Sequence, residues 1–252
     1  MRINGNTIFI PGATSGIGLA LALRLQEAGN QVIVGGRRTE LLEEIAAQHS
    51  GIDTIRIDTA DAASIAAAAS EVIARHPDLN VLIPMAGIMR AEEWTAPGSF
   101  LKTAEATVTT NVLGPIRLIA AFAEHLLAQP DATIMTVSSG LAFAPLQATP
   151  TYNATKAAVH QLSESLRLQF SGTSVRIVEL VPPSVQTDLM PGHAEDPHAM
   201  PLADYIDETM TILETQPDVT EVLVERVTFL RYGEVRGDQA QVIAALNGMQ
   251  TA

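Results

Sequence analysis

Short apolar runs alternate with longer segments of helical periodicity along most of the chain. Six runs rich in β-branched and aliphatic residues predict buried strands, at residues 7–11, 31–36, 54–57, 81–85, 133–138 and 175–181. The segments between them predict helices, at residues 16–28, 40–49, 62–76, 99–128 and 151–170. This alternation favours a parallel sheet, because right-handed crossovers place successive helices on both of its faces.

Capping residues support these helix bounds. Thr39 and Asp61 stand where the N-caps of two helices are expected, and Gly29 follows the first helix as a stop signal. We therefore expect one doubly wound α/β domain over residues 1–252, with a sheet of six to seven strands. The place of a seventh strand stays open, because residues 221–234 fit a helix or a strand equally well.

Proline and glycine gather after the sixth predicted strand, over residues 182–201. A break of this length is either a functional loop or a flexible insertion. It follows the carboxyl end of a strand, where open α/β sheets bind ligands. We therefore expect a substrate lid over about residues 183–214, with a helix at 203–214.

Composition narrows the function classes. The chain carries 28 acidic and 15 basic side chains, and its net charge of −13 has the wrong sign for holding a nucleic-acid backbone. It has no cysteine, which excludes disulfides and cysteine-bound metals and fits an intracellular setting. No apolar run approaches the roughly 18 residues that a membrane span needs, and the first strand begins too early for a signal peptide. We expect a cytoplasmic protein with no nucleic-acid or membrane partner.

A glycine-rich turn follows the first predicted strand and opens directly into a helix, with the spacing Gly12-x3-Gly16-x-Gly18. Glycines let the backbone turn tightly beside a pyrophosphate, and a helix N-terminus offers it free N–H groups. Such turns also occur in folds that bind no nucleotide, but the strand–turn–helix context favours a dinucleotide site.

Two arginines, Arg37 and Arg38, follow the second predicted strand. An acidic side chain near this point binds the ribose 2′-hydroxyl of NAD, whereas a basic one accommodates the 2′-phosphate of NADP. We expect the Arg37 guanidinium to pair with that phosphate, and Ser15 to add a hydroxyl contact. The alternative is that both arginines are surface charges at the start of a helix.

Three further side chains indicate proton transfer. Ser139 follows the fifth predicted strand, and Tyr152 and Lys156 lie four positions apart, on one face of the next helix. A free tyrosine titrates near pH 10, and an ammonium one turn away is expected to lower the phenol pKa by about 1 to 3 units in a desolvated cleft. Ser139 can hydrogen-bond a substrate oxygen and fix it beside that phenol.

This set of residues, in this order, carries a family resemblance. Gly12, Gly16, Gly18, Asn111, Ser139, Tyr152 and Lys156 together resemble the short-chain dehydrogenase/reductase family, in its branch of about 250 residues. The resemblance covers nearly the whole chain and implies a Rossmann-like fold, NADP(H) as cofactor and a homodimer or homotetramer. Residues 138–143, 182–189 and 224–227 further resemble the DltE-like subgroup of oxidoreductases.

The resemblance implies a role for each matching residue. Tyr152 is the general acid/base, Ser139 orients the carbonyl, and Lys156 lowers the tyrosine pKa and holds the nicotinamide ribose. Asn111 holds a water in a proton relay to Lys156, and Asp58 lies beside the adenine. Cofactor contacts are implied for Gly12, Thr14, Ser15, Gly16, Ile17, Gly18, Arg37, Arg38, Asp58, Ala86, Gly87, Tyr152, Lys156, Pro182, Val185 and Thr187.

Two departures from the family pattern concern the cofactor loops. Pro11 stands where the family usually has threonine, and Pro84-Met85-Ala86-Gly87 replaces Asn-Asn-Ala-Gly, so both ends of a polar brace are missing. Removing both partners of a hydrogen bond leaves no group unsatisfied. We expect the loops to keep their places, with a weaker cofactor affinity.

Other candidates have ordinary explanations. His193 and His198 lie near Glu195 and Asp196 in the lid, but no third ligand on a regular element accompanies them, so we expect no metal. Apolar side chains near the cleft fit either a substrate pocket or ordinary packing: Trp94, Leu141, Phe143, Met190 and Met200.

We therefore expect an NADP(H)-dependent oxidoreductase, of the carbonyl reductase type, that acts on a small to medium, apolar ketone or aldehyde. Two alternatives stay open. One is an NADP-binding sensor or scaffold without turnover, which the Ser139, Tyr152, Lys156 and Asn111 set argues against. The other is a dehydratase or isomerase on the same machinery, which product analysis separates because the cofactor is not consumed.

Overall fold

The computed structural model describes residues 2–96 and 98–249. Within them, seven strands form one parallel sheet in the order β3-β2-β1-β4-β5-β6-β7. They are β1 (Thr7–Pro11), β2 (Gln31–Gly36), β3 (Ile52–Arg56), β4 (Val81–Leu82), β5 (Ala132–Val137), β6 (Val175–Leu180) and β7 (Glu221–Val222). The doubly wound α/β prediction is confirmed, and the strand order reverses between β1 and β4, where such sheets bind ligands.

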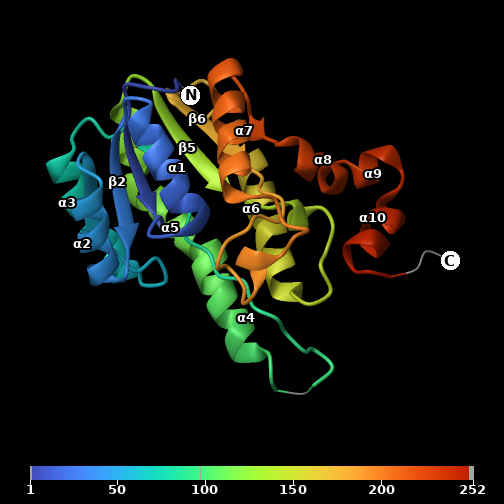
Figure 1. The fold of residues 1–252 in the computed structure, drawn as a ribbon. Coiled ribbons are helices and arrows are strands. Elements are labelled where there is room, and N and C mark those ends of the chain that lie inside the picture. Colours follow the sequence, from blue (N-terminus) through green and yellow to red (C-terminus); the bar gives the residue numbers. More distant parts are fainter. Residues whose placement is uncertain (1, 97, 250–252) are drawn as a thin grey trace.

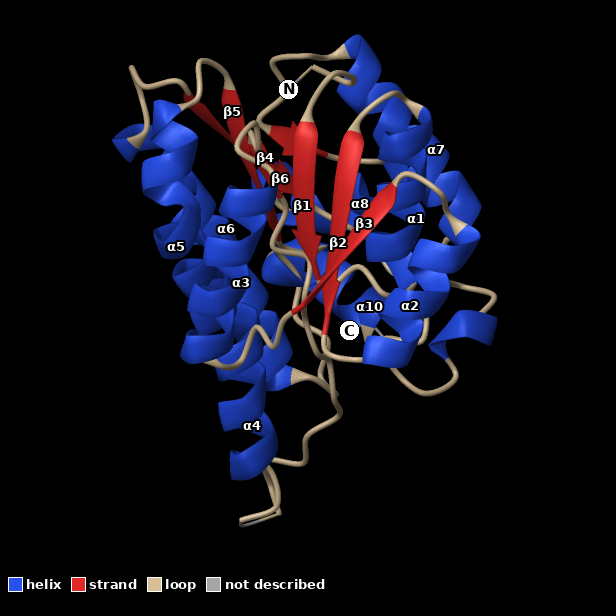
Figure 2. Ribbon diagram, turned by 90° about the vertical axis from the view of Figure 1, so that its left-hand side faces the viewer, coloured by secondary structure: helices blue, strands red, loops and turns tan. Residues whose placement is uncertain are grey.

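Helices connect the strands and cover both faces of the sheet (Figure 1). They are α1 (Gly16–Glu27), α2 (Thr39–Gln48), α3 (Ala62–Arg75), α4 (Leu101–Val108), α5 (Gly114–Ala128), α6 (Pro150–Gln169), α7 (Leu202–Thr215), α8 (Glu225–Arg231), α9 (Gly233–Arg236) and α10 (Gln239–Leu246). Figure 2 shows α3, α5 and α6 on one side of the sheet and α1, α2 and α7 on the other.

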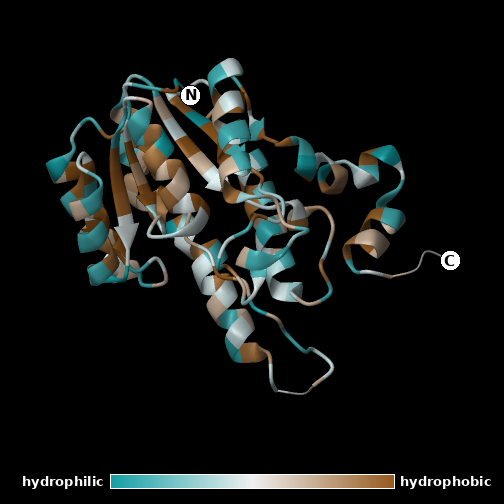
Figure 3. Ribbon diagram, in the orientation of Figure 1, coloured by the Kyte–Doolittle hydropathy of each residue, from teal (hydrophilic) through white to brown (hydrophobic). Residues whose placement is uncertain are grey.

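Two apolar clusters fill the space between the sheet and these helix layers. Ile8 and Ile10 of β1 pack with Leu21 of α1 in one cluster, whereas Phe9, between them in sequence, packs with Phe122 of α5 in the other. This alternation follows from the pleat, which sends successive side chains to opposite faces. Figure 3 accordingly shows hydrophobic strands between helices whose outer faces are largely hydrophilic.

The fourth strand is shorter than the predicted 81–85. Ile83 and Met85 donate their N–H groups to the carbonyls of Phe9 and Pro11 in β1. Because N–H groups alternate in direction along a strand, the one at position 84 would face β5, and proline has none to donate. Pro84 therefore ends the pairing with β5 after Leu82.

The cap predictions have mixed outcomes. Asp61 caps α3 by accepting a hydrogen bond from the Ala63 N–H, as expected. Thr39 is not an N-cap: it is the first residue of α2, and Arg38 stands at the cap position without a capping hydrogen bond from its side chain. The third strand begins two residues earlier than predicted, at Ile52.

The ambiguous segment 221–234 contains both kinds of element. Its first two residues form β7, which pairs with the end of β6 through Glu179 and Leu180, and α8 follows directly. A two-residue strand is too short to leave an alternating hydrophobic pattern, which explains why the sequence could not locate it.

The helical run Leu101–Ala128 corrects the expectation that no apolar segment is long enough for a membrane span. It consists of α4, a π-helical turn (Thr109–Leu113) and α5, and its 28 residues are long and apolar enough to cross a membrane by length and composition. However, α5 packs against α3, and its Leu118 and Phe122 side chains are buried in the core. A core helix meets the same criterion, so the run alone does not indicate a membrane span.

Candidate active site

The glycine-rich turn between β1 and α1 is built so that only glycine fits at its start. Gly12 has φ +96°, and a Cβ there would stand 2.4 Å from both the Cα and the N of Ala86. Gly16 has φ +56°, in the left-handed region that other residues rarely adopt. The turn therefore brings two segments of backbone into direct contact, with no side chain between them.

Backbone hydrogen bonds replace the polar brace that the sequence lacks. The Pro11 carbonyl accepts hydrogen bonds from the N–H groups of Met85 and Ala86, both at 3.0 Å. The glycine turn and the loop after β4 are thus held together by main-chain atoms. The expected weaker cofactor affinity stays a prediction.

The N-terminus of α1 can hold an anion. Ser15 is its N-cap residue, in extended conformation, and its side chain makes no capping hydrogen bond. N–H groups in the first turn of a helix lack intrahelical partners and point toward the positive end of the helix dipole, so they suit a pyrophosphate. Thr187, from the loop after β6, approaches this turn, with its Cγ2 3.4 Å from where a Cβ on Gly16 would stand.

The loop of residues 183–201 folds back on itself beside this turn. Val185 and Met200 form an isolated parallel bridge, and Gln186 donates its N–H to the Met200 carbonyl at 2.9 Å. In the following helix α7, Tyr205 is buried in the core. The predicted helix 203–214 is therefore confirmed as α7. Whether the whole 183–214 segment acts as a lid stays a prediction.

The two arginines after β2 have different partners. Arg38 donates from Nη2 to the Thr14 hydroxyl at 2.9 Å, within the glycine turn. Arg37 lies further out, with its Nη1 3.9 Å from the Asp58 Oδ2 and 68% of its side chain exposed. Asp58 also accepts a hydrogen bond from the Ala60 N–H. Both guanidinium groups flank the end of β2, but Arg38 contacts the glycine turn directly.

Ser139, Tyr152 and Lys156 come together in a buried group, as their spacing predicts. Ser139 follows β5, its Oγ accepts the Leu141 N–H at 3.1 Å, and its hydroxyl lies close enough to the Tyr152 phenol to lower the pKa of that group. The Lys156 Nζ lies 5.5 Å from the centre of the Tyr152 ring and donates to the Val137 carbonyl at 2.9 Å. All three side chains are buried.

The predicted lowering of the tyrosine pKa is wrong for this arrangement. Burial raises the pKa of Tyr152 to about 12, and the Ser139 hydrogen bond lowers it only in part. Burial also lowers the pKa of Lys156 to about 8, and the nearby Glu179 carboxylate opposes that shift. Both shifts have one cause, since burial disfavours the charged form of each group. The phenol is therefore neutral at pH 7.

Asn111 lies in the π-helical turn between α4 and α5, and its side chain is buried. Its Oδ1 accepts the Ile88 N–H and its Nδ2 donates to the Ile88 carbonyl, both at 2.9 Å. The same Nδ2 donates to the Thr155 hydroxyl at 3.2 Å. Asn111 thus ties the loop after β4 to the helix of Tyr152 and Lys156. Its role in holding a water stays a prediction.

Gly87 lies between the glycine turn and the buried group of Ser139, Tyr152 and Lys156. It follows Ala86, which contacts Gly12, and a Cβ on Gly87 would stand 3.5 Å from the Asn111 Oδ1 and 3.9 Å from the Lys156 Nζ. The glycine turn is therefore continuous, through two residues of one loop, with the buried lysine.

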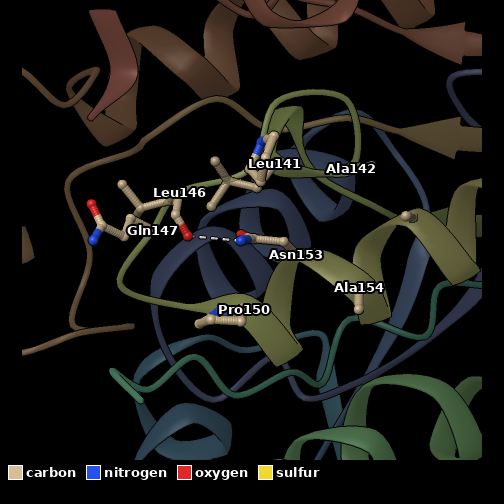
Figure 4. A pocket seen from close by; sticks show the side chains of 9 residues that line it. Leu141, Ala142, Leu146, Gln147, Pro150, Asn153 and Ala154 are labelled. Atoms are coloured by element: carbon tan, nitrogen blue, oxygen red, sulfur yellow. Dashed lines mark hydrogen bonds between the residues drawn. The ribbon is translucent and has the colours of Figure 1, made fainter. Parts of the chain in front are cut away.

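Two hollows lie beside the buried group. The smaller, of about 460 Å³, is lined by Leu141 and Ala142 from the turn after Ser139 and by Ala154 of α6. Figure 4 shows Leu141, Leu146 and Pro150 around it, with the Asn153 amide donating to the Leu146 carbonyl at 2.7 Å. The larger hollow, of about 710 Å³, shares Leu146 with the first. Within the described part of the chain, neither hollow is lined by Ser139, Tyr152 or Lys156.

Some of the apolar residues considered for a substrate pocket line a hollow, and others do not. Leu141 lines the smaller hollow, and Trp94 lines the larger one, stacked on Phe100 with ring centres 4.2 Å apart. Met200 is buried in the main core, so it serves packing. Phe143 packs edge-on against His160, outside both hollows.

Sequence reasoning missed a charged cluster behind the site. His160, Glu164, Glu179 and Glu221 place ligand-type atoms within 4.8 Å of one another, but Arg167 and Arg231 already pair with the carboxylates. Guanidinium partners compete with any metal for these oxygens, so the cluster does not favour a metal site. The one available signal was Glu179, a charged residue inside an apolar strand pattern.

Known proteins share this sequence and fold. The profile of the short chain dehydrogenase family matches residues 6–198. The uncharacterized oxidoreductase DltE of Bacillus subtilis is 41% identical over 189 residues, which cover 75% of this chain and 75% of that protein.

Two crystal structures share the fold over 98% of this chain. A short-chain dehydrogenase from Burkholderia cenocepacia, in complex with NADP, has a TM-score of 0.81, 24% identity and 99% coverage of its own chain. A short-chain dehydrogenase from Sphingobium yanoikuyae, in complex with NADPH, has a TM-score of 0.79, 23% identity and 98% coverage. With a family profile spanning most of its length and a DltE relative at this identity, the chain belongs to the short-chain dehydrogenase family of oxidoreductases.

Proposed function

We propose that the protein is an NADP(H)-dependent carbonyl reductase that uses Tyr152 as its proton donor. The observation that carries this proposal is the continuity of the glycine turn with the buried Ser139–Tyr152–Lys156 group through Ala86 and Gly87. The residues that would hold a dinucleotide, in the turn and along this loop, lead to the buried phenol.

NADP(H) is proposed from two kinds of support. Arg37 and Arg38 stand where a 2′-phosphate is recognised, and Arg38 already contacts Thr14 of the glycine turn. The two similar short-chain dehydrogenases were crystallised with NADP and NADPH. When bound, this cofactor supplies or accepts the hydride.

The chain's own residues supply the proton and the positioning. The neutral Tyr152 hydroxyl donates its proton to the substrate oxygen as negative charge develops there, and Ser139 holds that oxygen by a hydrogen bond. The Lys156 ammonium stabilises the phenolate that remains, since opposite charges attract strongly in a desolvated site. This assignment needs Lys156 to be protonated, which its pKa of about 8 allows at neutral pH.

The substrate is proposed to be a small to medium, apolar ketone or aldehyde. The smaller hollow is lined mainly by apolar side chains and begins at the turn directly after Ser139. The loop of residues 183–201, whose Thr187 approaches the glycine turn, is the proposed lid over the bound reactants. Among the described residues, this loop lines no part of the hollow, so the proposed lid covers the glycine turn.

A homo-oligomer is part of the same proposal. Large apolar side chains are exposed along α4, the π-helical turn and the start of α5, namely Leu101, Val108, Leu113 and Ile116. Contiguous exposed apolar surface is typical of a protein interface. Size-exclusion chromatography with light scattering is expected to give a mass of two or four chains, and a monomer would contradict this part of the proposal.

Turnover of NADPH with a panel of aldehydes and ketones tests the function. We expect nicotinamide absorbance to fall only when both protein and carbonyl compound are present. Tight binding of NADPH without turnover of any carbonyl compound would instead favour a sensor or scaffold. Consumption of the substrate without loss of NADPH would favour a dehydratase or isomerase.

A further inference from the structure

A fully buried carboxylate, Glu179, lies behind the proposed site, one residue before the end of β6. Its Oε1 accepts a hydrogen bond from the Ser138 hydroxyl, and both of its oxygens lie within 3.1 Å of the His160 Nδ1. The Arg167 Nη2 is 3.4 Å from its Oε2. A buried charge without such partners costs several kcal/mol, so these contacts account for how the carboxylate is tolerated.

The charged groups around Glu179 include more carboxylates than guanidinium groups. Glu164 pairs with Arg167, and Glu221 pairs with Arg231 through Nη2 and Oε2 at 3.1 Å. Three carboxylates therefore face two guanidinium groups. The His160 Nδ1 lies between Glu179 and Glu221, 3.8 Å from the Oε1 of the latter.

Lys156 is a further cation of the same helix, α6. It lies one helical turn before His160 on α6, on the same face. Glu179 is the charged group that acts on it from β6, and Tyr152 and Asn111 face it from α6 and from the π-helical turn. The Glu179 charge raises the pKa of Lys156 against the effect of burial, which lowers it to about 8.

The same carboxylate anchors the backbone that carries Ser139. Residues 137–139, the last residue of β5 and the two that follow it, are fixed at two successive points, because the Val137 carbonyl accepts from the Lys156 Nζ and the Ser138 hydroxyl donates to Glu179. Ser139 follows directly, and its hydroxyl lies beside the Tyr152 phenol. A shift of this segment would move Ser139 away from the phenol.

We propose that Glu179 is a positioning residue: it fixes the Ser138–Ser139 segment and provides the buried counter-charge that keeps Lys156 an ammonium ion. The effect on Lys156 is a property of the protein alone. Only its consequence for turnover rests on the proposed function.

The lysine composition makes the charge effect directly measurable. The chain has only two lysines, Lys102 and Lys156, and Lys102 is exposed on α4. Protein labelled with ¹³Cε-lysine therefore gives two lysine signals by NMR, which Lys102→Arg assigns, and Lys102 serves as an internal reference. In Glu179→Gln, a near-isosteric change, we expect the titration midpoint of Lys156 to fall by about 1 pH unit.

Glu164→Gln is the matched control. It also removes a carboxylate that pairs with Arg167, but Glu164 is not among the groups that act on Lys156 or bond Ser138. Its Lys156 midpoint is expected to match that of the wild type. A Glu179→Gln midpoint equal to that of the wild type, or a shift as large in Glu164→Gln, would overturn the counter-charge role.

Kinetics test the positioning role separately. In Ser138→Ala, which keeps the Glu179 charge, kcat for carbonyl reduction is expected to fall about 10-fold while KM for NADPH and the Lys156 midpoint stay unchanged. In Glu179→Gln, the alkaline limb of the kcat profile is expected to move to lower pH together with the Lys156 midpoint. Unchanged kcat in both variants would overturn the positioning role.

Two controls keep these outcomes distinct. If the wild type reduces no carbonyl compound, the proposed function fails, and the NMR titration still decides the role of Glu179. If Glu179→Gln does not fold, as judged by circular dichroism, Ser138→Ala alone decides the positioning role: folded protein with lowered kcat supports it, and unchanged kcat overturns it.

Discussion

The glycine turn and the Ser139–Tyr152–Lys156 group meet at one edge of the sheet, yet they are held in different ways. Main-chain atoms fix the glycine turn: the Pro11 carbonyl bonds the loop after β4, and Gly12 contacts Ala86 directly. Buried side chains fix the other group, through hydrogen bonds of Lys156, Asn111 and Glu179.

This difference predicts different sensitivities. A site built from backbone depends on the absence of side chains, so added atoms are expected to damage it. A site built from buried polar groups depends on each partner and on charge balance, because an unpaired buried group is costly. Substitutions in one region should therefore leave the other largely intact.

The largest effect is expected on kcat, when the proposed proton donor Tyr152 is replaced. Tyr152→Phe removes the hydroxyl that Ser139 contacts and is expected to lower kcat about 10³-fold. NADPH affinity should change little, because the glycine turn is held by main-chain atoms. Steady-state kinetics and a fluorescence titration of NADPH measure the two quantities, and turnover close to that of the wild type would refute the proton-donor assignment.

Adding a methyl group at Gly12 should destabilise the glycine turn. Gly12→Ala places a Cβ 2.4 Å from the Ala86 backbone at φ +96°, and we expect a loss of about 2–4 kcal/mol in the free energy of unfolding. Gly172→Ala is the control, because Gly172 has φ +82° but open space around it, so only backbone strain of about 1–2 kcal/mol is expected. Urea unfolding compares them, and equal losses would contradict the close-contact account.

Substitution of Arg37 or Arg38 tests the preference for NADPH over NADH. Arg37→Ala and Arg38→Ala are each expected to raise KM for NADPH about 10-fold more than KM for NADH, because each removes a guanidinium proposed to pair with the 2′-phosphate. Arg24→Ala removes a similar charge near the other end of α1 and serves as the control. If KM rises equally for both cofactors, the arginines do not recognise the phosphate.

The smallest effect concerns the pH dependence of stability. The pKa of Lys156 lies at about 8 in the folded protein, below its ordinary value of 10.5, so between these values the unfolded chain binds more protons. Stability contributed by this group therefore rises with pH across that window. Lys156→Met lacks this rise, so its stability relative to the wild type should decline from pH 8 to pH 10.5. Urea unfolding at several pH values checks this, and a pH-independent difference would contradict it.

Local features of the sequence predicted much of the site. The spacing of Gly12, Gly16 and Gly18 and the four-residue step from Tyr152 to Lys156 depend only on one turn or one helix, and the structure has both as expected. The strand–helix alternation likewise indicated the doubly wound sheet.

Features that depend on tertiary packing were not predictable in the same way. The π-helical turn at Asn111 lies within an uninterrupted helical pattern. The raised pKa of Tyr152 follows from how deeply the phenol is buried, which the spacing to Lys156 does not reveal. Glu179 was visible as a charge in an apolar strand, but its partners come from two other segments of the chain, the residues after β5 and α6.

Hydride transfer itself is the most direct test of the proposed chemistry. Wild-type protein is incubated with a reducible carbonyl compound and NADPH that carries deuterium at C4 on the transferred face, and the product is analysed by mass spectrometry. We predict one deuterium at the carbinol carbon of the product with the wild type and almost none with Tyr152→Phe. A converted substrate without deuterium, or equal labelling by the two proteins, would contradict the account.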